Sequence, residues 1–296
     1  MLRFRHLAAV VGINAIFGGA YIAGKTGVDH FPPLFFAAMR FGIIALLLLP
    51  FLRWNALMTA NIKSIAAFCL LMGAALYGTM YLALSLADGI SVILICTQFS
   101  VPAAAMLGMW FLGERPQRRT WLGIWLAFAG VMAAGFDYAL LGYWHATLLI
   151  IVSAIFYAAA NVISRDLRGV AGVINLNGWM ALVSAPVMLA LSAALESGQW
   201  QTLQSADASA ASALLYSALA VTLIGHTGMF ALLRLYPVSA VMPYYVLTPL
   251  FGIVGGVIIF DESLSLRFVL CAVVALTGVY IVNRTAGKKK KGKKGA

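Results

Sequence analysis

Two side chains stand out as capable of chemistry because they interrupt apolar runs of sequence. Arg40 lies in FAAMRFGIIALLLLP, and His226 lies in VTLIGHTGMF. A charge at the centre of a membrane helix costs about 2.5–3.5 kcal/mol on insertion scales, so Arg40 must face the protein interior or reach the interface. Arg40 is either a structural donor to backbone carbonyls or an anchor for a ligand carboxylate. His226 is either a neutral contact between helices or part of a ligand route.

Three amide side chains could bind a ligand that offers both donors and acceptors. Gln98 lies in ICTQFSVP, and its amide would suit an amino-acid-like ligand. A packing contact between helices is the alternative. The same two interpretations apply to Asn14 and Asn161, each of which lies in the first apolar run of one half of the chain.

Four tyrosines predict an aromatic-lined passage, with ordinary packing as the alternative for each ring. Tyr77 and Tyr81 are four residues apart and therefore share a helix face. Tyr244 and Tyr245 are adjacent, and prolines flank them on both sides.

Prolines inside apolar runs mark places where a helix kinks, because proline removes a backbone hydrogen bond. Membrane helices tolerate this where neighbours or a cavity satisfy the freed carbonyl. Pro102 and Pro249 lie at nearly equivalent places in the two halves, one residue out of register. We expect these two prolines to act as hinges.

The sequence argues against catalysis and against a metal or other cofactor. An intramembrane enzyme would need a nucleophile with its base, or a set of metal ligands, within the apolar runs. Neither an HExxH motif nor a paired aspartate motif is present, and a serine with His226 alone is weak support. The three cysteines, Cys69, Cys96 and Cys271, lie in apolar runs and fit small buried residues.

The elements that must position these residues are membrane helices. The chain is 63% hydrophobic and only 10% charged, with a mean hydropathy of +0.96, whereas a soluble domain has about 25% charged residues. A span needs about 20 apolar residues. On that basis we predict an all-α integral membrane protein with ten spans, at 6–26, 33–53, 63–86, 90–112, 119–137, 145–164, 172–194, 210–233, 238–260 and 267–284.

An internal repeat divides the chain into two halves. ALSLADGISV begins at Ala83 and ALLRLYPVSA begins at Ala231, and the later pair Gly130 and Gly278 has the same separation of 148 residues. We therefore predict one five-helix repeat in residues 1–140 and a second in residues 141–286. A repeat in an apolar chain is typical of transporters whose substrate site lies at the repeat interface.

The cations predict the orientation of the helices. With the N-terminus in the cytoplasm, seventeen of the twenty lysines and arginines fall on the cytoplasmic side and only Lys25 and Arg267 fall outside. Both termini are then cytoplasmic, and the basic tail 287–296 is predicted to be disordered. Because the net charge of +11 comes from the tail and from span flanks, we expect a lipid bilayer and a small molecule as partners, and no nucleic acid.

Five spans per half is an odd number, so the second half enters the membrane from the opposite side. Inverted repeats allow two states that face opposite sides of the membrane, which favours a carrier that works by alternating access. None of the nine carboxylates falls clearly in mid-span, so we expect transport without proton coupling through a buried carboxylate. A sugar-phosphate or nucleotide-sugar carrier is less favoured, because such cargo would need several cations within the spans.

Three segments resemble the EamA family of the drug/metabolite transporter superfamily: HFPPLFFAAMRF, GER with the following WLGIWLAFAGV, and DESLSLRFVLCAVVALTGVYIV. The resemblance covers nearly the whole chain and implies ten helices in a bacterial inner-membrane permease that exports amino acids or related metabolites. Pro32, Pro33, Arg40 and Gln98 match the cysteine and O-acetylserine exporter type. Phe17-Gly18 departs from the Trp-Gly pair common in the family. A drug carrier is a further alternative, and the chain is expected to be a monomer or a homodimer.

Overall fold

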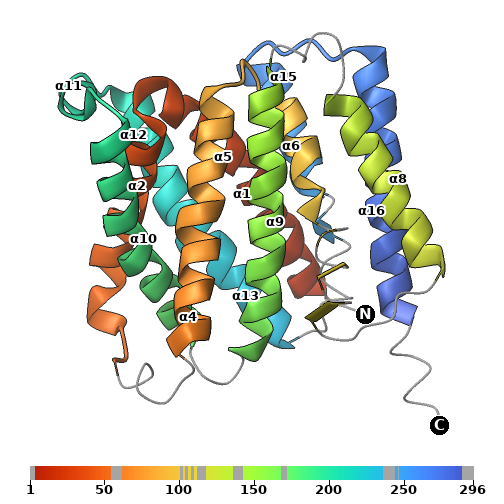
Figure 1. The fold of residues 1–296 in the computed structure, drawn as a ribbon, viewed down its shortest axis with the longest axis horizontal. Helices are drawn as coiled ribbons and strands as arrows, with labels where there is room; N and C mark the ends of the chain where they lie inside the picture. Colours follow the sequence, from red (N-terminus) through yellow and green to blue (C-terminus); the bar gives the residue numbers. More distant parts are fainter. Residues whose placement is uncertain are drawn as a thin grey trace.

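The computed structural model describes residues 4–54, 62–100, 103, 106–107, 110–111, 118–135, 143–167, 172–235, 244–245 and 247–288. These residues form helices and connecting turns, and no strand occurs among them. The helices lie side by side in a single bundle (Figure 1). The chain is therefore all-α over the part that the structure describes.

The first half begins with the long helix α1 (Phe4–His30), and α2 (Pro33–Leu48) continues into the short 3-10 helix η1 (Leu49–Phe51). The remaining helices of this half are α4 (Ile62–Cys69), η2 (Leu70–Ala75), α5 (Leu76–Ser85), α6 (Ser91–Thr97) and α8 (Arg118–Gly135). The segments α4, η2 and α5 follow one another without a break, and η2 is a π-helix.

The second half begins with α9 (Trp144–Asp166) and α10 (Val173–Leu195), and these are followed by α11 (Gln199–Gln204), α12 (Ala208–Leu215), η4 (Tyr216–His226), α13 (Thr227–Leu235), α15 (Leu247–Ile259) and α16 (Leu266–Lys288). Helix α11 lies in the connection between α10 and α12, outside the predicted spans. The segment η4 is a π-helix, like η2, and both occur in the third span of their half.

Six helical segments are long and apolar enough to cross a membrane: Phe4–His30, Pro33–Phe51, Ile62–Ser85, Trp144–Ile163, Val173–Leu195 and Ala208–Met229. Three shorter apolar stretches are Trp121–Gly130, Leu247–Ile259 and Leu266–Ile281. Each lies within one of the predicted spans or overlaps it, and α6 lies within the remaining one. Pro102 lies outside the described residues, as does most of the predicted tail 287–296.

Helices of the two halves pack in reciprocal pairs. Helix α2 packs on α10 and α8 packs on α16, so the second and the fifth predicted spans each contact their own repeat equivalent. Helix α1 packs on α15 of the other half, and α9 packs on α6 in the same way. The halves are thus interleaved rather than separate.

One end of the bundle carries α11, and we call it the α11 end; α1 begins and α16 finishes at the opposite end (Figure 1). At the α11 end, carboxylates accept from the backbone N–H groups that a helix start leaves unpaired. Glu196 accepts from Leu34 at 2.7 Å and from Phe35 at 3.0 Å, at the start of α2. Glu262 accepts from Ile90 and from Ser91 beside the start of α6. Both contacts join the second half to the first.

Candidate functional site

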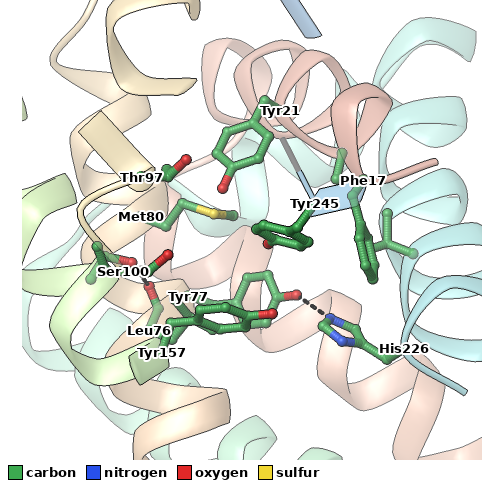
Figure 2. Close-up of a pocket in the computed structure, with 14 residues that line it drawn as sticks. Phe17, Tyr21, Leu76, Tyr77, Met80, Thr97, Ser100, Tyr157, His226 and Tyr245 are labelled. Carbon is green, nitrogen blue, oxygen red and sulfur yellow. Dashed lines mark hydrogen bonds between the residues drawn. The ribbon is translucent and has the colours of Figure 1, made fainter. Parts of the chain in front are cut away.

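A cavity lies near the middle of α1 and α9 and is bounded by residues of both halves. Aromatic rings form much of its wall, and Figure 2 shows five of them: Phe17, Tyr21, Tyr77, Tyr157 and Tyr245. Its polar groups are hydroxyls and one imidazole, from Tyr21, Tyr77, Thr97, Ser100, Ser153, Tyr157, His226 and Tyr245. No Lys, Arg, Asp or Glu is among the described residues that line it.

A helix end and a 3-10 turn lie beside the cavity at repeat-equivalent places. Helix α6 ends at Thr97, where Gln98 N donates to Ile95 O at 3.0 Å in a tight turn. In the second half, Tyr244 and Tyr245 form a short 3-10 turn just before α15. Thr97 and Tyr245 are 148 residues apart, and both line the cavity. Discontinuous helices of this kind supply the substrate sites of many transporters built from repeats.

A hydrogen bond across the two halves forms part of the cavity wall. The Tyr77 hydroxyl and His226 Nε2 are 2.7 Å apart, as the dashed line in Figure 2 shows. The ring of Phe17 lies 5.1 Å from the imidazole, centroid to centroid. His226 is the last residue of η4, and Tyr77 is the second residue of α5, which follows η2. π-Helical segments occur frequently at functional sites, and here one ends at His226 and another ends two residues before Tyr77.

Arg40 is fully buried behind the Tyr77 ring. Its Nη1 donates to the Tyr81 hydroxyl at 2.6 Å, and its Nη2 donates to Thr222 Oγ1 at 3.0 Å. Its Cζ lies 3.9 Å from the centroid of Tyr77. Arg40 itself is not among the residues that line the cavity. The guanidinium thus joins the two halves and supports a ring of the cavity wall.

Close helix contacts lie between the cavity residue Thr97 and the α11 end, where α6 begins. Gly18 of α1 meets Gly252 of α15, where an added Cβ would lie 2.8 Å from the backbone nitrogen of Gly252. A Cβ on Gly252 would in turn lie 2.5 Å from Leu94 of α6. Helices α1, α6 and α15 can therefore approach closely only because these positions lack a side chain.

The match to a family model decides the class of the protein. The model described as the EamA-like transporter family matches this chain twice, at residues 6–136 and 144–284. The chain belongs to the EamA-like transporter family. Membership places it among membrane transporters rather than enzymes, and it confirms the resemblance found in the sequence.

Curated relatives of this EamA transporter match it over nearly the whole length. One is the "Probable amino-acid metabolite efflux pump" of Escherichia coli (strain K12), 24% identical and covering 91% of this chain and 91% of its own. Another is the "Uncharacterized inner membrane transporter YedA" of the same organism, 24% identical, covering 95% of this chain and 94% of its own. One crystal structure superposes with a TM-score of 0.64 at 14% identity, covering 98% of this chain and 100% of its own, which supports the fold alone.

The structure brings some of the sequence-predicted site residues of this EamA transporter to the cavity. Tyr77, His226 and Tyr245 line it. Tyr81 does not: it is fully buried and holds Arg40. Tyr244 is partly buried and packs instead on the apolar cluster that contains Val10 and Ile13.

The three amides differ in their surroundings. Asn14 is buried; its Nδ2 donates to Val10 O and its Oδ1 accepts from Thr248 at 2.7 Å, which ties α1 to α15. Asn161 Nδ2 donates to Tyr157 O within α9 at 2.8 Å. Gln98 is fully buried, and neither polar atom of its amide has a hydrogen-bond partner in the part of the chain that the structure describes. It lies between two cavity residues, Thr97 and Ser100, without lining the cavity itself.

Of the two predicted hinges, only Pro249 is described. It is buried in the first turn of α15, four residues after the cavity residue Tyr245. Helix α15 runs from Leu247 to Ile259 and so continues past the proline. Hinge motion at Pro102 and Pro249 stays a prediction.

Several cavity residues were not predicted from the sequence, notably Phe17, Tyr21, Thr97, Ser153 and Tyr157. One signal could have found Thr97, because it stands 148 residues before the predicted site residue Tyr245. Tyr157 stands one helical turn before Asn161 and so shares its face. Phe17 was noticed only as the place where the sequence departs from the Trp-Gly pair of the family.

Proposed function

We propose that this EamA transporter is an inner-membrane carrier that exports a small neutral or zwitterionic metabolite, such as an amino acid, by alternating access. The observation that carries the proposal is a mid-bundle cavity that both halves build, with aromatic walls and only uncharged polar groups among its described lining. Such a lining suits a ligand with an apolar body and a few hydrogen-bonding groups. The names of the relatives, an amino-acid metabolite efflux pump and an inner membrane transporter, agree with it.

Ten helices in two inverted five-helix repeats, residues 1–140 and 141–286, form the proposed architecture. The reciprocal packing supports it: α2 on α10, α8 on α16, and α1 on α15 matched by α9 on α6. The cation bias then puts the α11 end outside and both termini in the cytoplasm. Because the close contacts near Gly252 lie between the cavity and the α11 end, we propose that the described state is closed to the outside.

Exchange between the two states needs the α11 end to open while the other end closes. The contacts to be broken are those made by Glu196 and Glu262, each of which joins one half to a helix start of the other. One chain contains the whole cavity, so a monomer is sufficient for this mechanism and a homodimer would place two copies side by side.

Counterflow in proteoliposomes tests the function. Vesicles loaded with one unlabelled amino acid at a time should accumulate the labelled form of a substrate transiently, whereas vesicles with empty lumens should not. A sodium or proton gradient should not be needed, and an imposed pH step should not drive uphill accumulation. Uphill movement driven by protons would contradict uncoupled transport and make His226 the first residue to test. Lack of counterflow across amino acids and related zwitterions would overturn the proposed cargo.

Cysteine labelling tests the inverted topology. In a chain without its native cysteines, single cysteines at Gln117 and Ser265 are predicted on opposite sides of the membrane. An impermeant reagent should label one in intact cells and the other only after permeabilisation. Labelling of both from the same side would contradict the inverted repeat.

A phosphorylated cargo is less favoured by this site. Sugar phosphates and nucleotide sugars carry about two negative charges and are usually held by direct contacts from Arg or Lys. The described lining contributes no Lys or Arg, and the nearest identified cation, Arg40, already donates to Tyr81 and Thr222 behind the Tyr77 ring.

A further inference from the structure

Arg40 carries a buried charge that no described carboxylate neutralises. Its exposed fraction is 0%, and its contacts are two hydroxyls and two aromatic rings, those of Phe41 and Tyr77. Among the side chains that the structure describes, no Asp or Glu lies within 4.0 Å of it, since the ion pairs found there are those of Lys25 with Asp29 and of His30 with Asp207. Its Nε has no hydrogen-bond partner among them either.

Only one aromatic ring separates this charge from the cavity. The guanidinium carbon lies 3.9 Å from the centroid of Tyr77, and the same ring lines the cavity. A ligand atom in contact with the ring would add roughly 4 Å, a normal separation of non-bonded carbons. The distance from the ligand to the charge is then about 8 Å. That is too far for a hydrogen bond, but it is close enough for a charge that water does not screen to act on the ligand.

The field of Arg40 is therefore felt in the cavity without any contact. A guanidinium stays protonated in proteins, so its charge is permanent. At an effective dielectric constant of about 20, a unit charge about 8 Å away changes the affinity of a charged group on the order of tenfold or more. No Lys, Arg, Asp or Glu among the described lining residues stands in the cavity to cancel this effect.

We propose that Arg40 is a specificity-determining residue that sets which sign of charge the cavity accepts. It favours a carboxylate placed against Tyr77, tolerates zwitterions that point their carboxylate that way, and rejects ligands whose only charge is positive. The proposal rests on the proposed function in one respect, that the ligand occupies this cavity. It separates metabolite cargo from the cationic compounds that a drug carrier of the same superfamily would take.

The charge belongs to one half of the molecule only. The repeat equivalent of α2, helix α10 (Val173–Leu195), contains no charged residue, and the positions 148 residues after Tyr77 and Tyr81 are Gly225 and Met229. A purely structural device needed by each half would be expected in both. The asymmetry instead fits a residue that acts on the single shared cavity.

A cysteine in the cavity wall measures this field without any knowledge of the substrate. We would replace Cys69, Cys96 and Cys271 by alanine and introduce Ser153→Cys, a close match in size at a buried lining position. The probes are an anionic sulfonatoethyl, a cationic trimethylammonioethyl and an uncharged methyl methanethiosulfonate, applied to the full chain in detergent. Ser209→Cys, an exposed position, gives the reference rates.

The expected result is a preference for the anion at position 153. Relative to the uncharged reagent and to the Ser209→Cys reference, the anionic reagent should react on the order of tenfold faster and the cationic reagent correspondingly slower. Arg40→Gln should remove the preference, whereas Arg40→Lys should keep it. Thr222→Val is the matched control, because it removes a hydrogen bond of Arg40 and leaves the charge.

Three results would overturn the proposal. One is a charge preference at position 153 no greater than at position 209, a comparison that needs no Arg40 variant and so holds even where Arg40→Gln does not fold. Another is an unchanged preference in folded Arg40→Gln. The third is no reaction of Ser153→Cys with any reagent, which would also remove the cavity from the proposed function. A clear preference without amino-acid counterflow would instead contradict only the proposed function.

Discussion

The two halves meet in two very different ways. Between α8 and α16 the contact is symmetric: a Cβ on Gly130 would meet the backbone of Ala275, and a Cβ on Gly278 would meet the backbone of Ala127. Ala275 is the repeat equivalent of Ala127, and Gly278 is the repeat equivalent of Gly130, so the same contact is made twice. At the cavity the contact is asymmetric, because Arg40 and Tyr77 of the first half contact Thr222 and His226 of the second, as described above.

This difference indicates how the repeat is used. Where two helices only need to approach closely, the same small residues serve in both halves. Where a ligand is bound, the halves supply different side chains, so the two sides of the single cavity differ in chemistry. We therefore expect substitutions at the symmetric contact to affect folding and substitutions at the cavity to affect binding.

The largest effect is expected at the symmetric contact. Gly130→Val and Gly278→Val would each force α8 and α16 apart, since the new side chain meets backbone that cannot rotate away. We expect each to reduce the free energy of unfolding by about 3 kcal/mol, the upper end of ordinary overpacking costs. Thermal unfolding and the yield of monodisperse protein in detergent measure this. Gly12→Val is the control, because nothing lies within 4 Å of its added Cβ; equal losses for all three would contradict the close contact.

A smaller effect, on binding rather than folding, is expected from Tyr77→Phe. The substitution keeps the ring over Arg40 but removes the hydroxyl paired with His226. We expect substrate affinity to fall about tenfold, the scale of one lost hydrogen bond, with little change in unfolding temperature. Tyr280→Phe, at an exposed position on α16, should change neither quantity. Unaltered affinity in folded Tyr77→Phe would exclude the pair from the binding site.

Glu262→Gln should weaken the closed α11 end. The backbone N–H groups of Ile90 and Ser91 would then donate to a neutral amide instead of a carboxylate. Losing a charged hydrogen bond reduces stability by about 1–2 kcal/mol. We expect Ser153→Cys to react several-fold faster with a reagent added from that side. Asp261→Asn, at the exposed neighbouring residue, is the control. Slower or equal labelling would show that this contact does not hold the end closed.

The smallest effect is expected at Asp207, the N-cap residue of α12, which takes part in neither contact. The backbone N–H of Ala210 donates to its carboxylate and lowers the pKa of Asp207 below the ordinary value, with His30 adding a weaker effect. A carboxyl group whose pKa is lowered by folding stabilises the folded protein at pH values above its ordinary pKa. This contribution is lost as the pH falls through the pKa of the folded state. The unfolding temperatures of wild type and Asp207→Asn should therefore differ slightly at about pH 7 and converge at about pH 3. A difference that grows toward low pH would contradict this sign.

Much of the fold could be predicted from the sequence. Runs of about 20 apolar residues place the helices, because a chain in lipid must satisfy its backbone groups internally. The repeat of 148 residues, found in the sequence alone, pairs Thr97 with Tyr245 at the cavity and Gly130 with Gly278 at the contact between α8 and α16. Tyr77, His226 and Tyr245 were also predicted as candidates from their residue types.

Only the tertiary structure decided which face of each helix is buried. A membrane helix is apolar all round, since lipid is as apolar as a protein core, so polarity does not mark the inward side. Sequence reasoning therefore could not separate Tyr77, which lines the cavity, from Tyr81 one turn away, which holds Arg40. It predicted only that Arg40 faces the protein interior or reaches the interface, because a charge exposed to lipid is costly. That the charge lies behind a ring of the cavity wall follows from the packing of α2 against α5 and η4.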